Sequence, residues 1–158
     1  MRILLINQYF FPDRAATSQL LGDLAEELVA CGHSVTALAG RGSYAAGREG
    51  RLSRREMWKG VRIERVWCTD RGRRRGIDRM ADYLSYFFFA GLRVLFGPRH
   101  DLVVCLSTPP LVAFLGRVAQ LRGSRFVYKV EDLYPDLALA MGTLKPGLVS
   151  RLLARLSR

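Results

Sequence analysis

Short, nearly continuous apolar runs alternate with segments of helical periodicity along most of the chain. Runs of this length with few polar interruptions are typical of strands buried on both faces of a parallel sheet. One further run alternates apolar and polar residues, which also indicates a strand. Strands are therefore predicted at residues 2–7, 34–39, 61–67, 101–106 and 126–130.

The segments between the predicted strands carry helix signals. Leucine and alanine recur at helical spacing from Leu20 to Leu28, Thr17 or Ser18 is placed to cap this helix, and Gly32 is placed to end it. Helices are also predicted at residues 77–96, 111–121 and 136–141, and a basic amphipathic segment follows from residue 148 to the end.

The order of these elements predicts the fold class. Strand, helix and strand follow one another through short connections, which indicates right-handed crossovers onto a parallel sheet with residues 2–7 as its first and central strand. With 158 residues and 49% hydrophobic content the chain can bury one good core, so a single α/β domain is expected. The arginine-rich stretch at 40–60 is predicted as a long loop that ends in a turn at residues 58–60.

The predicted strand at residues 126–130 stops at two adjacent carboxylates, Glu131 and Asp132. Because ligands bind at the carboxyl ends of strands in open α/β sheets, these acids are candidates for a ligand site. The simpler alternative is that Asp132 or Asp136 caps the next helix. The loop after the first strand reads Pro12-Asp13-Arg14-Ala15-Ala16-Thr17 and lacks a glycine fingerprint, which argues against dinucleotide binding.

Positive charge is concentrated in two stretches. The formal net charge is +11; residues 41–60 hold six basic and two acidic residues, and residues 71–79 hold five basic and one acidic residue. A localised positive field favours an anionic partner such as phospholipid, pyrophosphate or nucleic acid, and a solvated basic loop is the simpler alternative.

The predicted helix at residues 77–96 is apolar on more than one face, which is typical of a helix buried in the core. The alternative is a segment that lies in a membrane interface, because an arginine cluster precedes the helix. The two interpretations differ in whether an aromatic patch is exposed. The residues expected to meet the membrane are Arg73, Arg74, Arg75, Phe87 and Phe88.

Cysteine and histidine positions give no metal or disulfide signal. The three cysteines form no CxxC pair, and neither His33 nor His100 has clustered ligands around it, so no metal is expected. The apolar run at residues 3–6 is too short for the core of a signal peptide, and the tract at 83–97 is too short to span a bilayer. A cytoplasmic protein with reduced thiols is expected.

Several short motifs, spread through the whole chain in order, form a recognisable set. They are Asn7-Gln8-Tyr9-Phe10-Phe11-Pro12-Asp13, Leu24-Ala25-Glu26-Glu27-Leu28, Gly32-His33-Ser34-Val35-Thr36, Gly60-Val61-Arg62-Ile63, Ser107-Thr108-Pro109-Pro110 and Glu131-Asp132-Leu133-Tyr134-Pro135-Asp136. The set resembles the amino-terminal half of a retaining, GT-B-fold glycosyltransferase of family 4, in the branch that builds bacterial surface polysaccharides of the colanic acid and O-antigen types. The resemblance implies a Rossmann-like parallel sheet flanked by helices, one half of a GT-B fold.

The resemblance also implies roles for individual residues. Glu131 stands where many relatives carry a histidine beside the donor sugar, so Glu131 is the first candidate for catalysis and Asp132 the second. Residues 1–158 are expected to hold the acceptor, while a carboxyl-terminal domain or subunit outside them binds most of the nucleotide-sugar; without it the chain is expected not to turn over. Neither a metal nor a cofactor is expected. Contacts with substrate are expected from Asp13, Arg14, Thr17, Ser107, Thr108 and Tyr134.

The leading hypothesis is sugar transfer from a nucleotide-sugar to a membrane-linked acceptor of the polyprenyl-pyrophosphate type, at the inner face of the cell membrane. It joins the parallel sheet ending in polar loops, the localised arginine charge and the aromatic helix. The alternative is a non-catalytic module, split or remnant of such an enzyme, that recruits a partner to the membrane; Arg73 to Arg75 would then matter and Glu131 would not. Nucleic-acid binding rests on net charge alone, and no such partner is expected.

Overall fold

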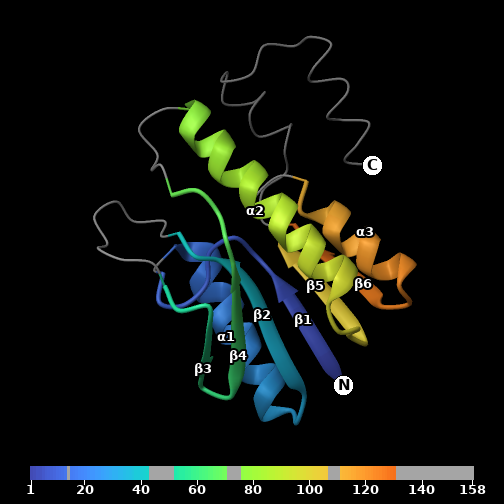
Figure 1. Ribbon diagram of the computed structural model, residues 1–158. Coiled ribbons are helices and arrows are strands. Elements are labelled where there is room, and N and C mark those ends of the chain that lie inside the picture. Colours follow the sequence, from blue (N-terminus) through green and yellow to red (C-terminus); the bar gives the residue numbers. More distant parts are fainter. Residues whose placement is uncertain (14, 43–51, 71–75, 107–110, 131–158) are drawn as a thin grey trace.

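The computed structural model describes residues 1–13, 15–42, 52–70, 76–106 and 111–130. These residues form a six-stranded sheet with helix α1 on one face and helices α2 and α3 on the other (Figure 1). In chain order, the elements are β1 (Arg2–Ile6), α1 (Ala16–Ala30), β2 (Ser34–Gly40), β3 (Arg55–Trp58), β4 (Val61–Val66), α2 (Gly76–Phe96), β5 (Leu102–Leu106), α3 (Ala113–Leu121) and β6 (Arg125–Lys129).

The strands lie in the order β3-β4-β2-β1-β5-β6. Strand β1 is therefore central, as predicted, and it pairs in parallel with both of its neighbours: Ile3 lies opposite Val35 of β2 and Leu102 of β5. Strands β4 and β6 extend the sheet in parallel on either side. The predicted α/β class with a parallel sheet is confirmed.

One strand was not predicted. Residues 55–58 form β3, which pairs antiparallel with β4, so the prediction of a loop over residues 40–60 is wrong at its end. The predicted turn lies between these two strands, where Lys59 and Gly60 have φ angles of 47° and 79°. Because β3 is a short edge strand with two exposed and two half-buried residues, it has no hydrophobic pattern that would reveal it.

The central strands are buried on both faces, and the direction of their side chains alternates between two hydrophobic clusters. Ile3 and Leu5 belong to the cluster beneath α1. Leu4 and Ile6 belong to the cluster beneath α2 and α3. All four side chains are at most 5% exposed, which explains why β1 reads as an apolar run without alternation.

Two helix starts differ from prediction. Ala15 is the residue that precedes α1, and no side chain caps this helix, so the predicted capping by Thr17 or Ser18 is wrong. Helix α3 begins at Ala113 and not at residue 111, because Leu111 has a φ of 79° and cannot continue a right-handed helix. At the other end of α1, Gly32 has a φ of 80° and donates its N–H to the Val29 carbonyl, which confirms it as the stop.

Helix α2 buries one stripe and exposes the rest. Its buried residues recur at every fourth position, namely Asp82, Tyr86, Ala90 and Val94. Tyr86 is fully buried, and its hydroxyl donates to the Leu38 carbonyl at 3.1 Å. The helix is thus a core helix on one face only, and its exposed large apolar residues are Ile77, Met80, Leu84, Phe88, Leu92, Leu95 and Phe96.

The turn between β3 and β4 offers a first prediction. A Cβ at Gly60 would lie 2.8 Å from Val29 Cγ1, and the φ of 79° already disfavours any side chain. We expect Gly60→Ala to lower the free energy of unfolding by about 2 kcal/mol in chemical denaturation. Gly123→Ala is the matched control, because Gly123 has a φ of 91° with nothing near its Cβ position; it should cost only about 1 kcal/mol. Equal costs would show that the contact with Val29 relaxes freely.

Candidate functional site

The strand order creates a switch point beside β1. The chain leaves β1 towards β2 on one side and later returns to form β5 on the other side. Strands β1 and β5 therefore end at the same edge of the sheet, where Ile6 lies opposite Cys105, and the helices that follow them, α1 and α3, lie on opposite faces. Crevices at such switch points, outside the carboxyl ends of the strands, are where open α/β sheets bind ligands.

The loop after β1 is tightly packed. Asn7, Gln8, Tyr9 and Phe10 are all buried. The Asn7 side-chain amide donates to the Tyr9 carbonyl at 2.7 Å, and the Gly40 N–H donates to the Gln8 carbonyl at 2.8 Å. These contacts hold the loop against the end of β2, so the loop provides a fixed wall at the switch point.

Three buried oxygens at this wall have no hydrogen-bond partner among the residues that the structure describes: Asn7 Oδ1, Gln8 Oε1 and Ser18 Oγ. A buried polar atom without a partner is uncommon, because leaving it unpaired costs free energy. The two amide oxygens are acceptors and the Ser18 hydroxyl can both donate and accept; all three lie around the end of β1 and the first turn of α1. Their chemistry suits donors such as sugar hydroxyls.

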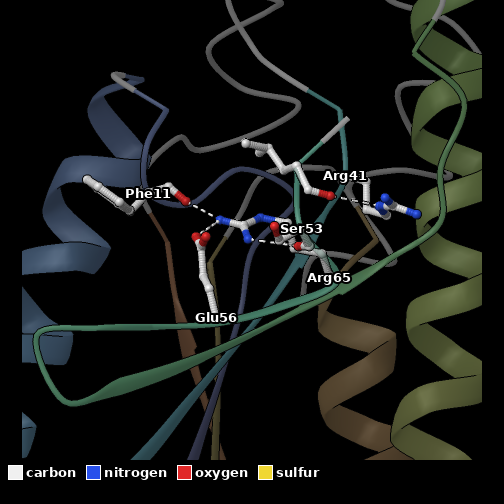
Figure 2. A network of polar contacts seen from close by, with 6 residues as sticks. Phe11, Arg41, Ser53, Glu56 and Arg65 are labelled. Atoms are coloured by element: carbon white, nitrogen blue, oxygen red, sulfur yellow. Dashed lines mark hydrogen bonds and ion pairs between the residues drawn. The ribbon is translucent and has the colours of Figure 1, made fainter. Parts of the chain in front are cut away.

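Arg65 fastens the loop to the far edge of the sheet and was missed by sequence reasoning. Its side chain is 1% exposed although it carries a charge. As Figure 2 shows, the guanidinium donates to the Phe11 carbonyl, to the Ser53 carbonyl at 3.1 Å and to Glu56 Oε1 at 2.6 Å. Arg65 thus joins the loop after β1 to β3 and β4. An arginine within the apolar alternation of residues 61–66 was the only signal in the sequence.

The aromatic rings of the same loop reinforce this connection. Trp58 of β3 stacks on Phe11 with ring centroids 4.8 Å apart and meets the edge of Phe10 at 5.8 Å. Trp58 also packs close to Gly22 of α1, where an added Cβ would lie 3.3 Å from the indole. The unpredicted strand β3 therefore supports the wall of the candidate site.

The predicted substrate-binding residues fall partly within the described chain. Asp13 is half-buried, and its carboxylate accepts the Ala15 N–H at 3.3 Å, which gives it a role in shaping the loop. Thr17 is half-buried in the first turn of α1. The remaining candidates lie outside the described residues: Arg14, Ser107, Thr108, Glu131, Asp132 and Tyr134.

Two of the segments that are not described, 107–110 and 131–158, come directly after described residues at the ends of β5 and β6. Ser107 and Thr108 follow Leu106 in the sequence, and Val130 separates Lys129 from Glu131. Leu106 and Lys129 lie opposite each other at the ends of β5 and β6. The next described residue, Leu111, has a φ of 79°, a conformation that non-glycine residues rarely adopt and that is often kept at functional sites.

Comparison with known proteins adds the family. Residues 17–158 match the family model described as a glycosyl transferase 4-like domain. The chain belongs to this family. A comparison with individual curated proteins found no match. Membership supports a glycosyltransferase domain, and the six-stranded sheet flanked by helices agrees with the Rossmann-like half expected for such an enzyme.

The two buried thiols of this glycosyltransferase domain, Cys68 and Cys105, are not suited to nucleophilic chemistry. Burial raises the pKa of Cys105, in β5 beside the switch point, to about 12. Burial also raises the pKa of Cys68, against a smaller opposing effect of backbone hydrogen bonds. Both thiols therefore stay protonated at neutral pH. Among the described residues, no three histidine, cysteine or acidic side chains are grouped to hold a metal ion.

The structure describes two of the five residues that were predicted to meet a membrane. Arg73, Arg74 and Arg75 lie outside the described residues. Phe87 is half-buried and packs against the cluster beneath α2, and its contact with a membrane stays a prediction. Phe88 is 59% exposed and lies on the outer face of α2. None of the helices described is long and apolar enough to cross a bilayer.

Proposed function

We propose that this domain is the acceptor-binding half of a glycosyltransferase that moves a sugar from a nucleotide-sugar to a membrane-linked acceptor. The observation that carries the proposal is the switch point beside β1, in a chain of the glycosyl transferase 4-like family. Transfer then requires a donor-binding domain, either elsewhere in the same polypeptide or on a partner. The acceptor class we propose is a polyprenyl-pyrophosphate-linked sugar used in surface-polysaccharide synthesis of the colanic acid or O-antigen type.

The chemistry of the proposed reaction assigns roles at the strand ends. Glu131 follows β6 and is proposed to orient the acceptor hydroxyl or to stabilise positive charge that develops on the sugar. Asp132 is the second candidate and is proposed to be structural. The buried amide oxygens at the end of β1 support a sugar-binding wall on the opposite side of β5. The proposed reaction uses no metal.

The exposed apolar row of α2 supports a site of action at the inner surface of the membrane. Leu84, Phe88 and Leu95 are between 45% and 59% exposed, and a row of this kind can lie against the boundary between headgroups and acyl chains. Residues 71–75, which precede α2, add four arginines that would attract anionic lipid.

The catalytic proposal is tested at Glu131. We expect Glu131→Ala to lower sugar transfer into membrane lipid by about tenfold or more when the chain is co-expressed with a matching donor-binding domain, because the variant loses a positioned carboxylate. Glu131→Gln separates charge from size, and Asp132→Asn is the matched control that should retain most of the transfer. Unchanged transfer in Glu131→Ala would refute the catalytic role and would favour the non-catalytic, membrane-recruiting module.

A further inference from the structure

A groove of about 490 Å³ lies between one flank of α2 and the β3–β4 end of the sheet. It exists because α2 packs on the sheet through Tyr86, Ala90 and Val94, while β3 forms the far edge of the sheet (Figure 1). A groove of this volume is large enough for a small-molecule ligand. Neither the family match nor the proposed roles of the strand-end residues assign anything to it.

The polar wall of the groove is strongly basic. Five arginines and one glutamate line it: Arg41, Arg54, Arg55, Arg65, Arg93 and Glu64. Two of the arginines are neutralised by carboxylates, because Arg93 Nε donates to Glu64 Oε2 at 2.8 Å and Arg65 pairs with Glu56. Within the described chain, the other three arginines form no ion pair.

These three arginines come from two neighbouring segments. Arg54 and Arg55 are exposed at the start of β3. Arg41 follows β2, is half-buried, and is held by a hydrogen bond from its Nε to the Leu52 carbonyl at 2.9 Å. Guanidinium groups gathered in this way match the geometry of a phosphate, which accepts paired N–H donors.

The opposite wall of the groove is apolar apart from Arg93, which is paired with Glu64. It is formed by Phe89, Leu92 and Phe96 of α2 together with Trp67, which follows β4. Trp67 and Phe89 meet edge to face with ring centroids 5.3 Å apart. Leu92 is 38% exposed and Phe96 is 78% exposed, so covering this wall with hydrocarbon would remove apolar surface from water.

We infer that this groove binds a lipid phosphate, with the phosphate on Arg41, Arg54 and Arg55 and the hydrocarbon chain along Phe89, Leu92 and Phe96. The opposed basic and apolar walls fit an anionic amphiphile better than a free anion or a neutral lipid. Arg65 lines the groove and also donates to the Phe11 carbonyl, so the groove is joined to the loop of the candidate site. Identifying this lipid with the acceptor rests on the proposed function; binding in the groove does not.

The test is a titration of the whole chain with dodecyl phosphate below its micellar concentration, followed by tryptophan fluorescence. Trp67 lines the groove, whereas Trp58 packs against α1 and the loop after β1, so a Trp58→Phe background leaves Trp67 as the reporter. We expect a blue shift of Trp67 emission on binding. The double variant Arg54→Gln, Arg55→Gln should bind about tenfold or more weakly. The matched control is Arg99→Gln, Arg117→Gln, which removes the same charge from exposed positions outside the groove and should change affinity less than about twofold.

Two further arms identify the ligand class. Inorganic phosphate and dodecyl maltoside should each bind about tenfold or more weakly than dodecyl phosphate, because each meets only one wall. Shortening the probe to decyl phosphate should weaken binding about tenfold in the parent chain. The weakening should be smaller in the variant Leu92→Ser, Phe96→Ser, which has lost part of the apolar wall. Both residues are exposed, so these substitutions leave the hydrophobic core intact. Thermal melts followed by circular dichroism confirm that each variant is folded.

The inference is overturned if dodecyl phosphate does not bind, if inorganic phosphate or dodecyl maltoside binds as tightly, or if the control pair weakens binding as much as Arg54→Gln, Arg55→Gln. None of these measurements needs a donor or a transfer reaction. Lipid-phosphate binding can therefore succeed where sugar transfer fails, and transfer can succeed where groove binding fails.

Discussion

Replacing Arg65 by methionine is expected to lower the free energy of unfolding by about 3 kcal/mol. The substitution keeps much of the apolar volume but removes every donor of a side chain that is 1% exposed. The Phe11 and Ser53 carbonyls then lose their guanidinium partner, and the Glu56 carboxylate, which is one-third exposed, loses its counter-ion. Urea denaturation followed by circular dichroism measures the loss.

Two variants separate the parts of this effect. Arg65→Lys keeps the charge but cannot donate in three directions from a planar group, so it should recover only part of the stability. Arg41→Gln is the matched control, because Arg41 is half-buried and, among the described residues, its side chain makes one hydrogen bond, to the Leu52 carbonyl; the change should cost about 1 kcal/mol or less. Equal losses in Arg65→Met and Arg41→Gln would contradict the network in Figure 2.

Tyr86→Ala is expected to have the larger effect, a loss of about 4 kcal/mol. Tyr86 is fully buried between α2 and the sheet, and no other residue joins α2 to β2 through both a ring and a hydrogen bond in the part of the chain that the structure describes. Truncation leaves a cavity in the cluster beneath α2 and an unpaired Leu38 carbonyl. The midpoint of chemical denaturation should fall accordingly.

The hydroxyl and the ring can be measured separately. Tyr86→Phe keeps the ring and removes only the donor at 3.1 Å from the Leu38 carbonyl, so it should cost about 1 kcal/mol. Leu84→Ala changes a residue of the same helix that is 58% exposed and should cost less than about 0.5 kcal/mol. If Tyr86→Phe were as damaging as Tyr86→Ala, the hydrogen bond rather than ring packing would hold α2 in place.

The buried parallel strands were predictable because burial on both faces leaves a continuous apolar run. β1 and β5 are such runs. β3 was not predictable for the opposite reason. Its residues Arg55 to Trp58 lie at an edge, and their partner strand is chosen by a turn at Lys59 and Gly60 rather than by hydrophobic pattern.

The amino-acid composition of α2 did not predict which of its residues are buried. Asp82 and Ala90 are buried, whereas Phe88 and Phe96 are exposed, so hydrophobicity alone points to the wrong residues. The small Ala90 lets the helix approach the sheet, and the ring of Tyr86 is fully buried there, whereas the rings of Phe88 and Phe96 face outward. Phe87 and Phe88 are the same residue type, yet Phe87 is half-buried and Phe88 is exposed, because they point in different directions around the helix axis.

The location of the candidate site could be predicted from the sequence, whereas the contacts that support it could not. Its place at the carboxyl ends of the strands follows from the order of elements in the sequence, and the switch point beside β1 is in the structure. The support of its wall by Arg65 depends on a contact with Phe11 across 54 positions of the chain, which no local pattern encodes. The roles of Glu131 and Asp132 stay predictions.

The central position of β1 also has a consequence for how the protein is made. β1 is the first strand of this sheet to be synthesised, yet Ile3 can pair on its second side only after Leu102 has been synthesised. The other half of the sheet, from β2 to β4, can assemble on β1 during synthesis, because those strands are complete by Val66. Pairing across so long a stretch of chain is slow. A ribosome stalled before β5 should therefore carry a nascent chain whose β1 amides still exchange with solvent on the side that β5 later covers.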